Sequence, residues 1–122
     1  MSVNLSMPVL VVDDYPFMAT VVTALLKQIG FEHVEGAENG LTAMQKLLRK
    51  NYGLVISDDT MEPISGGQLL DAIRANPRCA GTPFLMLTAP AGSKVEAMRA
   101  NTIVKPFNAR TLQTKIEALL AA

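Results

Sequence analysis

Cysteine and histidine are almost missing from this sequence of 122 residues. Cysteine forms disulfides, and the two residue types together supply most zinc ligands. The sequence contains one cysteine, Cys79, and one histidine, His33. A single cysteine cannot form an internal disulfide, and these two residues cannot build a zinc cluster. The sequence therefore argues against an oxidised, secreted scaffold. Any metal that the chain binds must be a hard cation held by oxygen ligands, because carboxylates are the ligands in supply.

An excess of charge of one sign is also missing. Eleven Lys and Arg residues balance eleven Asp and Glu residues, so the formal net charge at pH 7 is zero. This balance argues against binding to nucleic acid or to an anionic membrane through bulk charge. No apolar run approaches the ~18 residues of a membrane span, and the N-terminus lacks the features of a signal peptide. We therefore expect a cytoplasmic protein.

What is present is the composition of one folded domain. Hydrophobic residues make up 49% of the chain and charged residues 18%, which is ordinary for a globular protein. The length is also typical of a single domain. We expect residues 1–122 to form one domain with an ordered core at about 8–121.

Short apolar runs alternate with amphipathic stretches along the whole chain. The runs at 8–12, 54–57 and 83–88 are continuous, which is typical of strands buried on both faces. The segment 33–37 has mixed polarity and predicts an edge strand, and 102–104 predicts a fifth strand. Helical spacing of apolar residues between the runs predicts crossover helices. The result is an α/β fold, a parallel sheet with helices on both faces.

Three of the expected helices have particular sequence features. The first begins at Pro16, which suits a first helical turn, and ends at Gly30. The second begins at Asn39–Gly40, and 92–100 predicts a brief fourth helix. On one side of the second helix we expect Leu41, Met44, Leu47 and Leu48.

Polar side chains that can do chemistry stand at the ends of four expected strands. Function in an open parallel sheet lies outside the carboxyl ends of the strands, so these side chains can meet in one place. Aspartate is a poor strand former, so local preference does not explain its position there. In strand order the residues are Asp13 and Asp14, Asp58 and Asp59, Thr88, and Lys105.

Carboxylates that share one crevice repel one another unless a cation or a proton neutralises them. Mg²⁺ suits such a site, because it takes a few carboxylates and leaves room for a phosphoryl group. An ionised aspartate can then attack phosphorus, while a hydroxyl and an ammonium stabilise charge on the phosphoryl oxygens. Taken singly, each residue also fits a turn, a helix cap or a solvated loop. Together they favour a Mg²⁺-dependent phosphoryl-acceptor site.

The motifs V-V-D-D at 11–14, V-I-S-D at 55–58, L-T-A at 87–89 and K-P-F at 105–107 closely resemble those of response-regulator receiver domains. They are most similar to the single-domain chemotaxis (CheY-like) type, and the resemblance covers roughly 9–120. It implies a flavodoxin-like, doubly wound (βα)5 fold with a five-stranded parallel sheet in the order 2-1-3-4-5.

The same resemblance implies how the carboxylates act. Asp58 would accept a phosphoryl group from a histidine kinase. Asp14 and Asp58 would bind Mg²⁺ directly together with the backbone carbonyl of Thr60, and Asp13 would act mainly through metal-bound water.

The remaining site residues would respond to the phosphoryl group. Thr88 would hydrogen-bond to it and Lys105 would pair with it. Lys105–Pro106 resembles the cis peptide of the family, and Ala89 matches a small position that leaves the site open.

The resemblance implies a phosphorylation-activated signalling switch of a two-component pathway, of the chemotaxis kind. The switch would not be a conventional enzyme, although intrinsic autodephosphorylation is expected. Its partners would be the kinase and a downstream protein target, such as the flagellar motor or another chemotaxis component. No direct contact with nucleic acid or membrane is expected.

Two departures from the family pattern leave alternatives open. The segment between Thr88 and Lys105 is about five residues short, which removes more than one turn and predicts a shortened fourth helix. Thr102 replaces an aromatic residue that usually reports phosphorylation. Both fit an alternative role as a phosphate sink or shuttle that competes for the kinase. A Mg²⁺-dependent phosphohydrolase with an aspartyl-phosphate is a third hypothesis, but its D-x-D motif and cap domain are missing.

Overall fold

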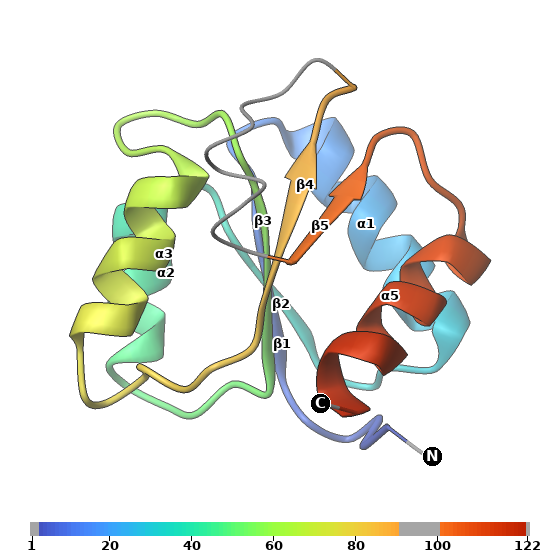
Figure 1. Ribbon diagram of the computed structural model, residues 1–122, viewed down its shortest axis with the longest axis horizontal. Helices are drawn as coiled ribbons and strands as arrows, with labels where there is room; N and C mark the ends of the chain where they lie inside the picture. The colour runs from blue at the N-terminus through green and yellow to red at the C-terminus, as the bar shows by residue number, and fades with distance from the viewer. Residues whose placement is uncertain (1–2, 91–100, 122) are drawn as a thin grey trace.

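The computed structural model describes residues 3–90 and 101–121, in which a five-stranded sheet lies between two layers of helices (Figure 1). All neighbouring strands are parallel, and their order is β2-β1-β3-β4-β5. The sequence-based fold class and strand order are thus confirmed. The strands are β1 (Val9–Val12), β2 (Val34–Ala37), β3 (Leu54–Asp58), β4 (Phe84–Thr88) and β5 (Asn101–Val104).

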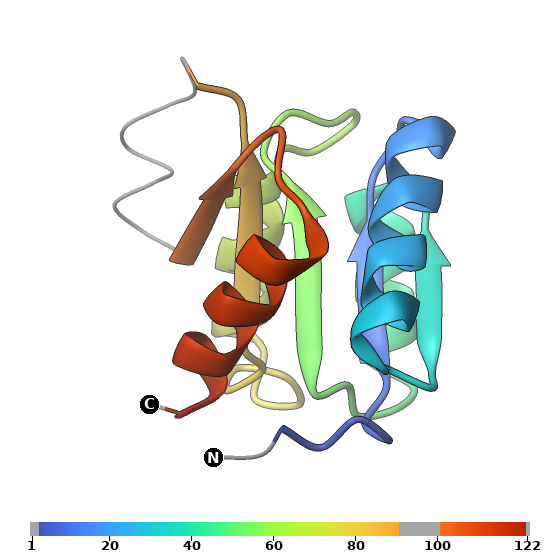
Figure 2. The same cartoon turned by 90° about the vertical axis from the view of Figure 1, so that its right-hand side faces the viewer.

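Helices cover both faces of this sheet. In Figures 1 and 2, α2 and α3 lie on one face, and α1 and α5 lie on the other. No described helix is long and apolar enough to cross a membrane. The short fourth helix expected at 92–100 lies outside the described residues. The described helices are α1 (Pro16–Ile29), α2 (Gly40–Leu47), α3 (Gly66–Ala75) and α5 (Ala109–Ala121).

The three central strands separate two hydrophobic cores. Every residue of β1, β3 and β4 is buried, which explains why their sequences are continuous rather than alternating. Alternate residues of β1 serve opposite cores. Leu10 and Val12 belong to the core under α2 and α3, whereas Val9 and Val11 belong to the core under α1 and α5. The polar ends of these strands are consequently held on a rigid support.

Helix α1 begins and ends where its sequence predicts. Pro16 occupies the start of the helix, and Gly30 caps its C-terminus with φ 126°, a backbone angle that favours glycine. Val22 and Leu26 are its buried residues. The helix starts two residues after Asp14, the second of the aspartates that follow β1.

The predicted apolar side of α2 is partly wrong. Leu41 and Leu48 are 53% and 47% exposed, and the buried residues are Gly40, Ala43 and Leu47. A Cβ on Gly40 would lie 2.5 Å from the Ile64 side chain, so the helix packs closely at its small residues. This close approach fixes the rotation of the helix. Leu41 follows Gly40, and Leu48 follows Leu47. Each is therefore turned about 100° from a buried residue, towards solvent.

Helix α3 starts against the end of β3. Ser65 caps the helix in a capping box with Gln68. The Gly66 N–H donates to the Asp59 carbonyl at 3.0 Å, and a Cβ on Gly66 would lie 2.3 Å from the Asp58 carbonyl oxygen. Only glycine allows this contact, which fixes the loop between β3 and α3 over the carboxyl edge of the sheet.

Candidate metal and phosphoryl-acceptor site

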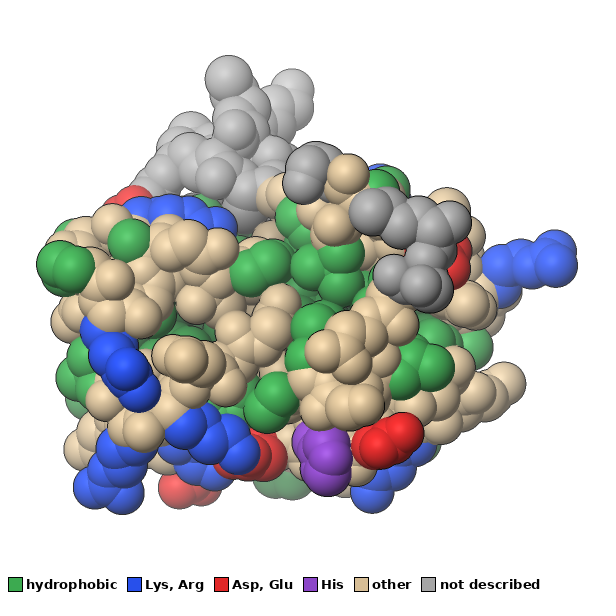
Figure 3. All heavy atoms as spheres, turned by 90° about the horizontal axis from the view of Figure 1, so that it is seen from below, with side chains coloured by type: hydrophobic (Ala, Val, Ile, Leu, Met, Phe, Trp, Pro, Cys, Tyr) green, Lys and Arg blue, Asp and Glu red, His purple; other side chains and the backbone are tan. Residues whose placement is uncertain are grey.

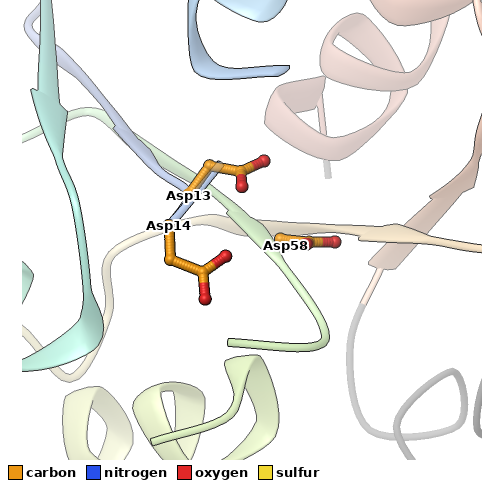
Figure 4. Close-up of side chains that lie close together, drawn as sticks. All are labelled: Asp13, Asp14 and Asp58. Carbon is orange, nitrogen blue, oxygen red and sulfur yellow. The ribbon is translucent and has the colours of Figure 1, made fainter. Parts of the chain in front are cut away.

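Three aspartates meet at the carboxyl edge of the sheet. Asp13 and Asp14 directly follow β1, and Asp58 is the last residue of β3. The two strands are neighbours, and Val12 is aligned with Ser57, so the next residues along each strand lie side by side. One carboxylate oxygen from each aspartate lies within 4.8 Å of the others. Figure 4 shows the three side chains gathered at the ends of these two strands.

Asp13 has a buried oxygen without a partner. Its Oδ1 accepts a hydrogen bond from the Tyr15 N–H at 2.9 Å. Its Oδ2 is buried and has no hydrogen bond to any residue that the structure describes. Burial raises the pKa of Asp13, and the Tyr15 N–H opposes that increase only in part. An unpaired buried carboxylate oxygen is unfavourable unless a cation or a proton satisfies it.

Asp58 is buried but has partners. Its Oδ1 accepts hydrogen bonds from the Lys105 ammonium at 2.7 Å and from the Asp59 N–H at 3.0 Å. Burial raises the pKa of Asp58, and the hydrogen bond and charge of Lys105 work against this. The carboxyl group therefore lies between a desolvating interior and a cation that favours its ionised form.

Lys105 is positioned by the end of β4. The Lys105 N–H donates to the Thr88 carbonyl at 2.8 Å, which continues the pairing of β4 with β5 beyond the last strand residue. The Lys105–Pro106 bond is cis, as the sequence resemblance implied. A second cis bond, between Glu62 and Pro63, was not anticipated.

Thr88 ends β4 beside the aspartates. It is buried, and Asp58 is aligned with Leu87, so Thr88 lies one residue beyond that pair. Its hydroxyl donates to the Ile103 carbonyl at 3.5 Å, which is a long and weak hydrogen bond. The hydroxyl is thus not strongly committed to another acceptor.

Thr60 lies in the loop after β3, and its side chain is exposed. Its hydroxyl donates to the Asp59 carboxylate at 3.3 Å. The same loop reaches the site through Glu62, whose N–H donates to Asp14 Oδ2 at 3.3 Å. The expected role of the Thr60 carbonyl as a metal ligand remains a prediction.

Sequence reasoning missed two groups that shape the site. One is the Glu62 N–H, a backbone group that no residue pattern reveals. The other is Gly66, whose missing Cβ lets α3 contact the Asp58 backbone. The available signal was the Ser-Gly-Gly at 65–67, a helix cap followed by residues that form helices poorly.

The donor set fits a hard divalent cation. The three clustered residues offer carboxylate oxygens and no nitrogen or sulfur ligand. Mg²⁺ prefers a few carboxylates completed by water and phosphate oxygens. The unpaired Oδ2 of Asp13 is a further reason to expect a positive charge here.

Comparisons with known proteins agree on one family. Residues 9–117 match the model of the response regulator receiver domain. The chain is 37% identical to chemotaxis protein CheY-3 of Vibrio cholerae serotype O1 over 121 residues, 95% of this chain and 93% of that protein. It is 36% identical to chemotaxis protein CheY of Pseudomonas aeruginosa PAO1 over 118 residues, 93% of this chain and 95% of that protein.

Solved structures of response regulators have a similar fold. The fold superposes on chemotaxis response regulator CheY4 of Vibrio cholerae with a TM-score of 0.84 at 32% sequence identity. This similarity covers 94% of the present chain and 99% of that one.

Proposed function

This chain belongs to the family of response regulator receiver domains, and we propose that its Asp58 accepts a phosphoryl group from a histidine kinase. As a family member it is a phosphorylation-activated switch of two-component signalling. One observation carries the assignment of the acceptor: the Asp58 carboxylate lies 2.7 Å from the Lys105 ammonium and clusters with Asp13 and Asp14.

The transfer requires Asp58 in its ionised form. A carboxylate oxygen of Asp58 attacks the phosphorus of a phosphohistidine, and the new O–P bond forms as the N–P bond breaks. The imidazole nitrogen leaves with the electron pair and takes a proton from solvent. Burial favours the protonated Asp58, whereas Lys105 favours the carboxylate that can act as the nucleophile.

Two further side chains would hold the phosphoryl group. The Lys105 ammonium already contacts Asp58 Oδ1, so it can pair with a phosphoryl oxygen attached to this residue. The Thr88 hydroxyl, with its 3.5 Å bond to a carbonyl, can exchange that weak bond for a stronger one to a charged oxygen. This exchange would pull on the end of β4 and connect the chemical step to a change of conformation.

Asp14, Asp58 and the backbone carbonyl of Thr60 would hold Mg²⁺, with Asp13 acting mainly through a water molecule. The bound ion supplies positive charge that offsets the repulsion between the carboxylates and an incoming phosphoryl group. The unpaired Asp13 Oδ2 supports this proposal.

The wider biological role follows from the relatives. Two of them are named chemotaxis proteins, which supports a chemotaxis pathway, a kinase as phosphodonor and a target such as the flagellar motor or another chemotaxis component. We place the protein in the cytoplasm and take residues 1–122 as a single receiver domain. Its only catalytic step would be loss of its own phosphoryl group.

The acceptor is tested by incubating the protein with phosphoramidate and Mg²⁺ and measuring its intact mass. Wild type should gain one phosphoryl group, and Asp58→Asn should gain none. Asp59→Asn is the matched control, because Asp59 is a neighbouring carboxylate of equal burial, 8% exposed like Asp58. Undiminished labelling of Asp58→Asn would rule out the assignment.

A further inference from the structure

The amino edge of the sheet, opposite the aspartates, carries a hollow of about 280 Å³. It lies between the end of α2 and the loop that joins α3 to β4, and its walls come from 50–52 and 77–83 together with Leu47. Of the lining residues that the structure describes, two are basic, Lys50 and Arg78, and none is acidic. We call this feature the basic hollow. Figure 3 views this edge and shows several Lys and Arg side chains at the left, with Asp and Glu side chains among them.

One wall of the basic hollow is held in place by side-chain contacts. The Lys50 ammonium pairs with the Glu35 carboxylate and lies 5.2 Å from the centre of the Tyr52 ring. The Tyr52 hydroxyl donates to the same carboxylate at 2.8 Å. The Lys50 hydrogen bond lowers the pKa of Glu35, which keeps the pair ionised. This wall is therefore ordered and close to neutral overall.

The other wall carries the positive charge of Arg78, which no carboxylate of residues 3–90 or 101–121 neutralises. Arg78 is exposed, and its side chain has no hydrogen bond or ion pair to a residue that the structure describes. The Arg74 guanidinium donates to the carbonyls of Ala80 and Thr82 at 2.9 and 2.7 Å. These carbonyls are neutral, so Arg74 stiffens the loop around the hollow without losing its charge. Arg78 is thus an exposed cation that can pair with a carboxylate of another molecule, and it lies in a loop that Arg74 holds in place.

The zero net charge of the chain hides this arrangement. Acidic residues concentrate at the carboxyl edge of the sheet, where Asp13, Asp14 and Asp58 cluster. The hollow at the amino edge has Lys50, which is paired with Glu35, and the exposed Arg78. A protein surface of one sign attracts and orients a partner surface of the opposite sign.

We propose that the basic hollow binds an acidic segment of a protein partner, with Arg78 pairing to a carboxylate of that segment. Leu48, 47% exposed at the end of α2, offers an apolar contact in the same stretch of chain as Lys50. A peptide presents both carboxylates and apolar side chains, so it matches both kinds of group. This interaction goes beyond the proposed function, because it needs neither Asp58 nor a phosphoryl group.

Other occupants fit less well. Bases of single-stranded nucleic acid need an aromatic face for stacking. Tyr52, the only aromatic residue among the lining residues described, is 7% exposed and already faces Lys50. The volume of about 280 Å³ is slightly below the usual range for small-molecule sites, ~300–1,000 Å³. A membrane-bound face would need a broad apolar surface, and Leu48 alone does not provide one.

The test is the fluorescence anisotropy of a fluorescein-labelled decaglutamate peptide titrated with the full chain. Wild type should bind it saturably, and added salt should weaken binding. Arg78→Glu should raise Kd roughly tenfold or more, because the carboxylate loses its partner and meets a like charge. Lys115→Glu is the matched control: it makes the same charge change at an exposed position of α5 and should leave Kd within about twofold.

Asp58→Asn should bind the peptide like wild type, which separates this proposal from the phosphoryl-acceptor assignment. Equal losses in Arg78→Glu and Lys115→Glu would overturn the proposal, because bulk charge alone would then explain binding. Absence of saturable binding would overturn it too. Tighter, Arg78-dependent binding of an oligothymidylate would assign the hollow to nucleic acid instead. Amide shifts of the wild type should change at 50–52 and 77–83, and changes confined to α5 would contradict the site.

Discussion

The unpaired Oδ2 of Asp13 is the residue-scale feature that most restricts the chemistry of the site. Burial raises the pKa of this carboxyl group above its value in the unfolded chain. An acid with a raised pKa binds more protons in the folded state, so stability falls as the pH rises from the pKa of the unfolded chain through the raised pKa of the folded state. The protein therefore tolerates a destabilising carboxylate at neutral pH, which is reasonable if the group serves to hold a cation.

Asp13→Asn should stabilise the metal-free protein at pH 7, because the amide is uncharged and its oxygen can still accept the Tyr15 N–H bond. We expect a gain on the order of 1 kcal/mol in the free energy of unfolding, measured with urea. The gain should disappear below about pH 3.9, where the wild-type carboxyl is protonated in both states. Asp13→Asn less stable than wild type at pH 7 would contradict this account of the site.

At the scale of elements, the contact of α3 with the end of β3 positions the acceptor. Gly66 sits at the start of α3, where a Cβ would be 2.3 Å from the Asp58 carbonyl oxygen. The helix start and the acceptor backbone therefore cannot move independently.

Gly66→Ala should force these two segments apart. We expect a loss of roughly 1–3 kcal/mol in the free energy of unfolding, as for other overpacked positions, together with slower phosphorylation. Gly81→Ala is the control, because nothing lies within 4 Å of a Cβ added there. Urea unfolding and phosphoramidate labelling measure the two effects, and equal behaviour of the two variants would show that the contact does not matter.

Some features of the helices and strands could be predicted from the sequence, and others could not. Continuous apolar strands and the polar residues at their ends are local patterns, so the sheet and the meeting of Asp13 with Asp58 could be predicted. The rotation of α2 could not, because it depends on how closely Gly40 approaches Ile64, a residue of another segment. The Leu41 prediction failed for this reason. The order of apolar and polar residues along the chain shows which residues are apolar. It does not show which segments of backbone lie in close contact in the fold.

For the whole molecule, we expect the clustering of acids at one edge of the sheet to make stability depend on divalent cations. A ligand that binds only the folded state stabilises it by mass action, about 2.7 kcal/mol at 100 times Kd. We expect Mg²⁺ to raise the melting temperature of the wild type and EDTA to reverse the effect. Asp13→Asn should reduce the increase, whereas Glu117→Gln, an exposed acid on α5, should not. The lack of any Mg²⁺-dependent shift in the wild type would argue against the metal site.

If Asp58 carries the phosphoryl group, the label can be located on this residue directly. The protein is phosphorylated with phosphoramidate and Mg²⁺, the acyl phosphate is reduced with borohydride to homoserine, and the modified residue is mapped by peptide mass spectrometry. Homoserine should form at position 58 alone. Homoserine at Asp13, Asp14 or Asp59, with Asp58 unmodified, would contradict it.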